Sequence, residues 1–225
     1  MTFDDFKRHF EIFSQIDSAE KLAICEIQYQ NHLLEIEDTK YFEPDRDDVK
    51  IKQVQNYEKN LYKIFGLDTI EENKIYFLIR PSFEPEHLLL LEKLPEKFAL
   101  THTTLIKSYW TTFYADNSNM DCERKVSKTV LNSAVGDSLF KLLEKTIMDA
   151  RPPKVKKLVL DGVVYMLLKL SDGERKIVSK HSPDENSGSG QVIRIAKQLI
   201  DNIERLDDPA ILSNLQVAMV KLQGK

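Results

Sequence analysis

Apolar residues recur at helical spacing through the first 66 residues of the chain. The first stripe, with members three or four positions apart, consists of Phe3, Phe6, Phe10, Phe13 and Ile16. The second stripe consists of Leu22, Cys25, Tyr29, Leu33 and Ile36. Ser18 can cap this second helix, and a third amphipathic segment, Val49–Phe65, stops at Gly66. The pattern therefore predicts three amphipathic helices in this part of the chain.

From residue 74 onward the apolar period changes to that of strands. Lys74–Arg80 is rich in β-forming residues and is followed by Pro81, which favours the end of a strand. His87–Leu94 fits either a second strand or a helical turn, because its consecutive leucines are too uniform for periodicity to decide. Phe98–Tyr114 is long for one strand and predicts a bulge or break near Lys107–Tyr109.

A three-stranded meander is predicted after the two consecutive prolines at 152 and 153. Its strands are Val155–Leu160, Val163–Leu170 and Glu174–Lys180, and Asp161-Gly162 suits the tight turn between the first two. The middle run is apolar in both registers, which is typical of a central strand covered on both faces. The third run is rich in charge, as expected of a protected sheet edge.

Four further segments have helical spacing or loop composition. Val126–Ala150 is predicted to be helical, with Gly136-Asp137 able to split it. Gln191–Leu206 is strongly amphipathic, and Asp207-Asp208-Pro209 favours the start of a last helix. Directly before Gln191, the segment His181–Gly190 is rich in Ser and Gly and is interpreted as a mobile loop or linker.

The order of these elements predicts an α+β protein. We expect an N-terminal helical layer and a mainly antiparallel sheet, built from about 74–114 and 155–180 and covered by helices. The expected division is a helical N-terminal region, 1–72, and an α+β domain, 73–225, packed as one unit.

Charge is divided unevenly along the chain, although the formal net charge is only −4. Residues 1–73 hold 9 Lys/Arg and 17 Asp/Glu, a net of 9 − 17 = −8, whereas residues 121–181 hold 13 and 8, a net of 13 − 8 = +5. Such a division is most often a solvated charged surface, and it also fits an acidic surface that meets a partner or two regions that face each other. The acidic candidates for binding a basic protein partner are Glu35, Glu37, Asp38, Glu43, Asp45, Asp47 and Asp48.

Composition also guides the expected location of the protein. There is no long apolar run of membrane-spanning length, and the N-terminus carries acids where a signal peptide carries bases. We therefore expect a cytoplasmic protein that binds no membrane. Cys25 and Cys122 are far apart in the sequence and are expected to be reduced thiols.

The catalytic candidates are His102 and Thr104, which alternation places on one face of a strand. The motif His102-Thr103-Thr104-Leu105 resembles the His-x-Thr/Ser-apolar signature of the two-histidine phosphoesterases. That resemblance implies a second copy of the motif, which completes the acid/base pair, and no second copy occurs in this sequence. His181-Ser182 with Asp184 does not have the spacing of a catalytic triad and is interpreted as a turn.

Other chemistry finds little support in the sequence. The cysteines and histidines lack metal-ligand spacing, so no metal and no cofactor is expected. Gly188-Ser189-Gly190 lacks the ending of a nucleotide-binding loop. A small basic patch, Arg151, Lys154, Lys156 and Lys157, has no interleaved aromatic residues, which argues against nucleic-acid binding. The aromatic run Tyr109–Tyr114 suits either core packing or a binding hot spot.

The part from Ile75 to Leu206 resembles a loose group of small uncharacterised bacterial α+β proteins. The shared marks are Arg80-Pro81-Ser82-Phe83, Asp161-Gly162-x-x-Tyr165 and His181-Ser182-Pro183. Some proteins of this size and composition neutralise secreted toxins as immunity partners. The leading hypothesis is therefore a non-enzymatic interaction protein, with toxin neutralisation as one form of it. The alternatives are a phosphoesterase-like enzyme centred on His102 and a small-ligand-binding protein.

Overall fold

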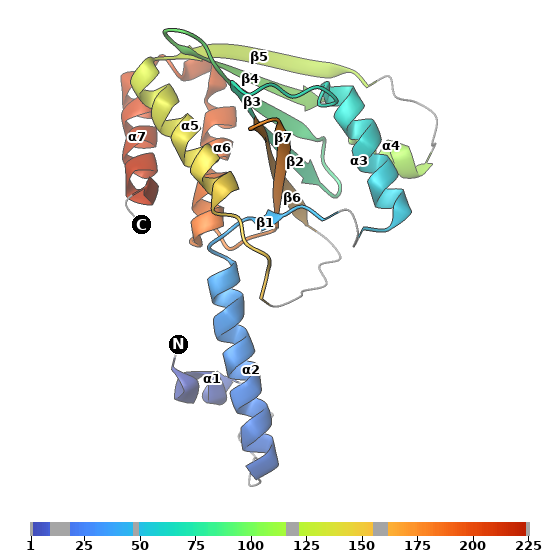
Figure 1. Cartoon of the computed structure of the whole chain (residues 1–225), viewed down its shortest axis with the longest axis vertical. Helices are drawn as coiled ribbons and strands as arrows, with labels where there is room; N and C mark the ends of the chain where they lie inside the picture. Colours follow the sequence, from blue (N-terminus) through green and yellow to red (C-terminus); the bar gives the residue numbers. More distant parts are fainter. Residues whose placement is uncertain (1, 10–18, 47–49, 116–121, 155–161, 224–225) are drawn as a thin grey trace.

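The computed structural model describes residues 2–9, 19–46, 50–115, 122–154 and 162–223. The chain has an α+β fold in which helices flank an antiparallel sheet of order β1-β7-β6-β2-β3-β4-β5 (Figure 1). The strands are β1 (Glu43–Pro44), β2 (Lys74–Pro81), β3 (His87–Lys93), β4 (Phe98–Leu105), β5 (Arg124–Leu131), β6 (Val163–Ser171) and β7 (Glu174–His181). The predicted fold class is thereby confirmed, and β6 lies in the interior of the sheet, as its two apolar faces predict.

The helices lie in sequence before, between and after these strands. They are α1 (Phe3–His9), α2 (Ala19–Asp38), α3 (Lys52–Phe65), α4 (Tyr109–Ala115), α5 (Ser133–Met148), α6 (Gly188–Asp201), the 3₁₀ turn η3 (Ile203–Arg205) and α7 (Pro209–Gln223). Gly66 ends α3 with φ 70° and donates its backbone N–H to α3 carbonyls, as the sequence predicts.

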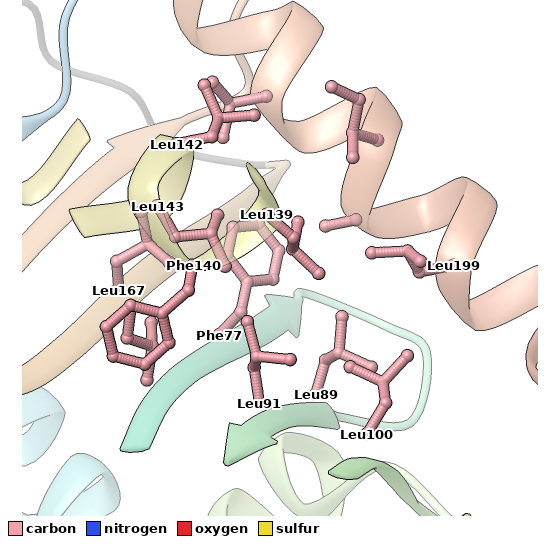
Figure 2. Packing of buried hydrophobic residues seen from close by; sticks show 14 of the residues in the cluster. Phe77, Leu89, Leu91, Leu100, Leu139, Phe140, Leu142, Leu143, Leu167 and Leu199 are labelled. Atoms are coloured by element: carbon pink, nitrogen blue, oxygen red, sulfur yellow. The ribbon is translucent and has the colours of Figure 1, made fainter. Parts of the chain in front are cut away.

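The larger core lies between one face of the sheet and helices α5, α6 and α7. Alternate side chains of β2 and its neighbours point to this side because successive strand residues face opposite ways. Figure 2 shows Phe77, from β2, among side chains from β3, β4, α5 and α6. Phe77 and Leu139 each expose only 1% of their surface. This face is therefore a dry apolar layer.

The opposite face of the sheet packs against α3 and α4. Its apolar cluster includes Tyr57 and Leu61 from α3, Phe113 from α4 and Met166 from β6. The aromatic run predicted as either core or hot spot is divided here, because Tyr109 and Phe113 are buried whereas Tyr114 is 42% exposed.

The predicted helix Val126–Ala150 is wrong in its first part. Arg124–Leu131 is strand β5, and helix α5 begins at Ser133 behind an N-cap in which Asn132 accepts a hydrogen bond from the Val135 N–H at 3.0 Å. The helix is not split at Gly136. A Cβ at Gly136 would come within 2.1 Å of the Phe98 ring, so the glycine permits close packing of helix on sheet.

The predicted long strand Phe98–Tyr114 is broken where expected, but its second half is helix α4 and not a strand. His87–Leu94 resolves as strand β3. The first strand of the predicted meander, Val155–Leu160, lies outside the described residues. The meander's third strand is not the sheet edge over its whole length, because β1 pairs with Ser179 and Val178 of β7.

The Ser/Gly-rich segment departs from the predicted loop only at its end, because residues 182–187 are irregular and Gly188–Gly190 belong to α6. Ser187 caps α6 by accepting a hydrogen bond from the Gly190 N–H, and the glycines form the first turn of the helix. A Cβ at Gly190 would lie 1.9 Å from the Asp184 carbonyl, and one at Gly188 would lie 2.7 Å from the Lys40 carbonyl. Both glycines are therefore required by close backbone approach.

Helices α1 and α2 project from the rest of the molecule (Figure 1). We call this pair the α1–α2 arm, and the sheet with its flanking helices the body. The arm has its own small apolar cluster, formed by Phe6 and Cys25 with Phe3 and Tyr29 packed against them. Of the predicted N-terminal helices, α3 lies on the sheet, and α1 and α2 form the arm.

Candidate functional site

The arm uses one face of α2 to hold α1. Phe3 and Phe6 of α1 contact the ring of Tyr29, with centroids 5.3 and 5.4 Å away, and Phe6 also contacts the His32 ring at 5.3 Å. Cys25 is fully buried at this contact. The stripe that the sequence predicts for this helix is therefore used in its middle, whereas its last member, Ile36, remains 46% exposed.

A second apolar face of α2 has no cover from the described part of the chain. Helical geometry, about 100° per residue, places Ile24 and Ile27 roughly 140–160° around the helix from Tyr29. Their exposed fractions are 44% and 61%. We define the outer face of α2 as Ile24, Ile27, Asn31 and Leu34, which recur at the three- and four-residue spacing of a single helix face.

Sequence reasoning missed Ile24 and Ile27. They lie off the main apolar stripe, which is the face that periodicity identifies. The signal was present, because a helix with apolar residues on two sides normally has two apolar neighbours. Only one such neighbour, α1, is found in the described residues.

The base of the arm is anchored in the body. Phe42, just after α2, is 1% exposed and belongs to the larger core. The Thr39 carbonyl accepts hydrogen bonds from Ser189 of α6, from the backbone N–H at 3.4 Å and from the hydroxyl at 2.5 Å. The Arg151 N–H donates to the Phe42 carbonyl at 3.0 Å. These contacts fix the direction in which α2 leaves the body.

A buried ammonium group closes the C-terminal end of α2. Lys180 of β7 donates from Nζ to the Asp38 carbonyl at 2.8 Å and forms an ion pair with Glu43 at 2.7 Å. The Lys180 side chain is 7% exposed. A cation at this end of a helix is favourable because the last carbonyls carry partial negative charge.

Four of the predicted acidic partner-binding residues contact lysines of the chain itself: Glu37, Asp38, Glu43 and Asp45. Glu37 pairs with Lys154 at 2.7 Å, and the Asp38 carboxylate accepts from the Lys154 N–H at 2.8 Å. The hydrogen bond from Lys154 holds the pKa of Glu37 below its usual value. Asp45 pairs with Lys50 at 2.6 Å. Two oppositely charged regions thus face each other, which was one interpretation of the charge division.

The remaining acidic candidates are distributed differently. Glu35 is half-buried on α2, one turn before the base contacts. Asp47 and Asp48 lie outside the described residues. Partner binding by the acidic set therefore stays a prediction, and several of its carboxylates have internal partners as well.

A small hollow lies beside the base of the arm. Its lining includes Glu37, Tyr41, Glu43, Arg151 and Lys154. The Arg151 guanidinium lies 3.9 Å from the centre of the Tyr41 ring, a cation–π contact that occupies one wall. The lining mixes both signs of charge, so it complements neither an anion nor a cation.

The histidine candidate for catalysis has a histidine partner from the next strand. Nε2 of His102 lies 3.1 Å from Nδ1 of His87, and the two rings are inclined by only 13° with centroids 5.3 Å apart. The N···N contact spans most of the centroid separation, so the rings meet edge to edge. Burial lowers the pKa of His102 to about 4, helped by charge on His87 and Lys125. Both rings are neutral near pH 7, because burial also lowers the pKa of His87.

Neither Thr104 nor His181 completes a catalytic pair with His102. Thr104 shares its face, as alternation predicts, but its hydroxyl donates to the Leu105 carbonyl at 3.2 Å. His181 lies on β7, separated from β4 by three strands in the sheet order. Val178 and Leu100 both belong to the larger core, so alternation places His102 on that side and His181 on the other.

The body also contains a buried ionic network that the sequence did not indicate. Arg80 of β2 pairs with Glu58 of α3, and both side chains are less than a tenth exposed. The Lys50 Nζ lies 2.7 Å from the carboxylate of the same residue, Glu58. Although burial opposes its charge, the carboxylates of Glu58 and Asp45 hold the pKa of Lys50 above its usual value. Each charge has an opposite partner, so the network ties α3 to the sheet.

A second buried carboxylate holds α4 in place. Glu86 is fully buried and accepts from the backbone N–H groups of Tyr109 and Trp110, both at 2.8 Å, and from the Tyr57 hydroxyl at 2.7 Å. A carboxylate at a helix N-terminus satisfies donors that have no partner within the helix. The Glu86 carboxylate therefore has a structural role, because it holds the N-terminus of α4.

Metal and membrane sites find no support in the described residues. Nowhere in those ranges do three His, Cys, Asp or Glu side chains gather in a group that could hold a metal ion. None of the described helices combines the length and apolar content needed to cross a bilayer. Of the predicted basic patch, Arg151 and Lys154 lie at the base of the arm, and Lys156 and Lys157 are outside the described ranges.

Comparison with known proteins gives no relative. No family model matches the sequence, and no curated protein or solved structure matches it.

Proposed function

We propose that this chain is a partner-binding protein whose α1–α2 arm carries the contact surface. One observation supports this most strongly: the outer face of α2 leaves Ile24 and Ile27 44% and 61% exposed on an arm whose base is firmly anchored. Exposed apolar side chains gathered on one projecting helix are typical of helix-in-groove recognition. Anchoring lowers the entropy lost on binding, because the helix is already formed and directed.

The charge of the arm supports a basic partner. Residues 1–42 hold 4 Lys/Arg and 9 Asp/Glu, a net of 4 − 9 = −5. We infer a partner with a basic surface around an apolar groove, because complementary charge speeds association and disfavours wrong partners. A second copy of the same acidic arm is a poor occupant, since like charges would repel.

Neutralisation of a secreted toxin is one form of this proposal. It is suggested by the resemblance to small bacterial α+β proteins, and an acidic, projecting helix suits a basic toxin. Co-expression with a candidate toxin tests this form: protection that requires Ile24 and Ile27 supports it, and protection without them contradicts it.

The general proposal is tested by affinity capture with matched variants. The full chain is immobilised and exposed to a lysate of the organism that encodes it, and the captured basic protein is purified and titrated. We expect Ile24→Glu combined with Ile27→Glu to weaken its binding at least about 30-fold, the effect of losing one strong hot-spot side chain.

A matched control is available on α7. Val217 and Val220 have the same three-residue spacing and are 53% and 57% exposed. Val217→Glu combined with Val220→Glu should leave binding unchanged. Equal loss in both double variants, or a dimer of the chain that disappears only in the α2 variant, contradicts the proposal.

A further inference from the structure

The two edges of the sheet are built differently. One edge is β1, a strand of two residues that ends at Pro44. The other is β5, eight residues long, which pairs with β4 in an unbroken register from Arg124 opposite Leu105 to Leu131 opposite Phe98. Natural sheets usually shorten, bend or interrupt their edges. Within the described residues, β5 is a full-length edge without a bulge and with no strand beyond it (Figure 1).

The register shows which backbone groups of β5 point outward. The Ile106 N–H donates to the Glu123 carbonyl, and the Leu105 N–H donates to Glu86 on the β3 side. In an antiparallel pair, bonded and non-bonded residue pairs alternate. Residues 125, 127, 129 and 131 therefore bond to β4. Residues 124, 126, 128 and 130 direct their N–H and C=O groups away from the sheet.

The side chains of these same four residues are exposed. They lie on the face opposite the larger core, since Arg124 pairs with Leu105 of the α3–α4 side. Val126 and Val130 are 50% and 53% exposed, and Lys128 lies between them. Backbone donors and acceptors, two apolar side chains and an exposed lysine thus occur together on one edge.

Positive charge is one edge-protecting device of β5, and the turn η3 packs beside the strand. Two such edges side by side would bring Lys125 and Lys128 of one copy near the same lysines of the other, and this like charge weakens the pairing of two copies. An acidic strand would instead be attracted to both. The charge therefore disfavours pairing with this chain's own β5 and favours an acidic partner.

We propose that the outer edge of β5 binds an extended acidic segment of another protein, which adds to the sheet as an antiparallel strand. Its affinity comes from the backbone groups of residues 124, 126, 128 and 130. Its specificity comes from side chains of the bound segment: β-branched residues that lie beside Val126 and Val130, and carboxylates that lie beside Lys125 and Lys128. This surface is separate from the α1–α2 arm and does not depend on the proposed function.

The probe follows from the pairing. A capped peptide of sequence Val-Thr-Glu-Thr-Val-Glu-Thr places its valines opposite Val130 and Val126 and its glutamates opposite Lys128 and Lys125. It is titrated into the isotope-labelled full chain, and amide shifts are followed by NMR. The control peptide carries lysine in place of both glutamates.

Lys128→Pro and Lys128→Ala separate backbone pairing from charge. Proline removes the outward N–H of residue 128 and no bond to β4, so it is tolerated on this edge. Both variants lack the lysine charge. We expect Lys128→Pro to bind the acidic peptide at least about tenfold more weakly than Lys128→Ala does. Proline removes one hydrogen bond to the peptide, and its ring occupies the place of the lost N–H. Equal thermal midpoints for the two variants check that both are folded.

The expected shifts centre on residues 124–130 and are absent with the lysine peptide. Equal binding of Lys128→Pro and Lys128→Ala, shifts centred elsewhere, or no saturable shift with the acidic peptide would overturn the proposal. A concentration-dependent dimer that loses these amide shifts would also overturn it, because a second copy would then be the occupant.

Discussion

The body and the arm use apolar side chains in different ways. In the body, Phe77 and Leu139 are 1% exposed and packed between sheet and helices. In the arm, α1 covers one side of α2, and Ile24 and Ile27 on the other side remain about half exposed. Apolar side chains at helical spacing are therefore buried in the body, whereas some of them remain exposed in the arm. Periodicity predicts a helix face, and only the neighbouring elements decide what covers it.

This difference has an energetic consequence. Each Å² of apolar surface removed from water contributes about 25 cal/mol. The body gains this on folding, whereas the outer face of α2 gains it only when something binds. An isolated helix is marginal in water. The arm therefore depends on α1 and on the contacts of Asp38 and Thr39 at its base.

The largest expected effect is in the dry core of the body. Phe77→Ala should lower the free energy of unfolding by about 3–5 kcal/mol, because a large buried ring leaves a cavity that the packed neighbours cannot fill. Chemical denaturation followed by circular dichroism measures it. A loss below about 1 kcal/mol would show that this face is less tightly packed than described.

The buried ionic network should give the next largest effect. Glu58→Gln should cost roughly 3 kcal/mol, because Arg80 and Lys50 would keep buried charges without their shared carboxylate. The matched control is Lys93→Ala, whose partner Asp137 lies in an exposed pair and whose loss should cost less than about 1 kcal/mol. Similar costs for both would mean that burial of the network contributes nothing.

A pH-dependent effect of intermediate size is expected from the histidine pair. The pKa of His102 falls from an ordinary 6.5 to about 4 in the folded chain, so the unfolded chain binds the proton more readily. Stability should then decrease as the pH falls from about 6.5 towards 4, by roughly 2 kcal/mol. Denaturation midpoints for the wild type and His102→Gln, measured across this range, isolate the contribution.

The comparison between the two proteins removes other acid effects. Asp201 and Glu84, which lie near the pair, are present in both. An identical pH slope in the two would contradict the assignment to His102.

The smallest effect on stability should come from the arm. Ile24→Glu combined with Ile27→Glu should change the free energy of unfolding by less than about 0.5 kcal/mol, as for ordinary surface positions. The same denaturation experiment measures it. A loss comparable to that of Phe77→Ala would mean that these residues are core, and the distinction between body and arm would fail.

Much of the fold could be predicted from local pattern. Gly66 and the stripe before it identified α3, and the two apolar faces of Val163–Leu170 identified a central strand. The first part of Val126–Ala150 was wrongly predicted to be helical. The four-residue spacing of Val126 and Val130 fits a helix face and equally fits alternate positions of an edge strand. Gly188 and Gly190 were assigned to a mobile loop because composition does not reveal close contacts with Lys40 and Asp184.

The candidate site was less accessible to sequence reasoning. The acidic residues of the base were identified, but their pairing with Lys154 and Lys180 depends on segments more than a hundred positions away in the chain. Likewise, no local pattern reveals that α2 projects. Which face of an amphipathic helix stays open is a property of tertiary packing, and so Ile24 and Ile27 emerged only with the fold.

Site-specific photo-crosslinking tests the central claim most directly. A benzophenone amino acid replaces Ile27 in one strain and Val217 in another, each in the organism that encodes the chain, and the two positions have similar exposure. Position 27 should give a crosslink to one basic protein, and position 217 should not. No product at position 27, identical products at both, or a crosslink to a second copy of the chain would contradict a partner-binding arm.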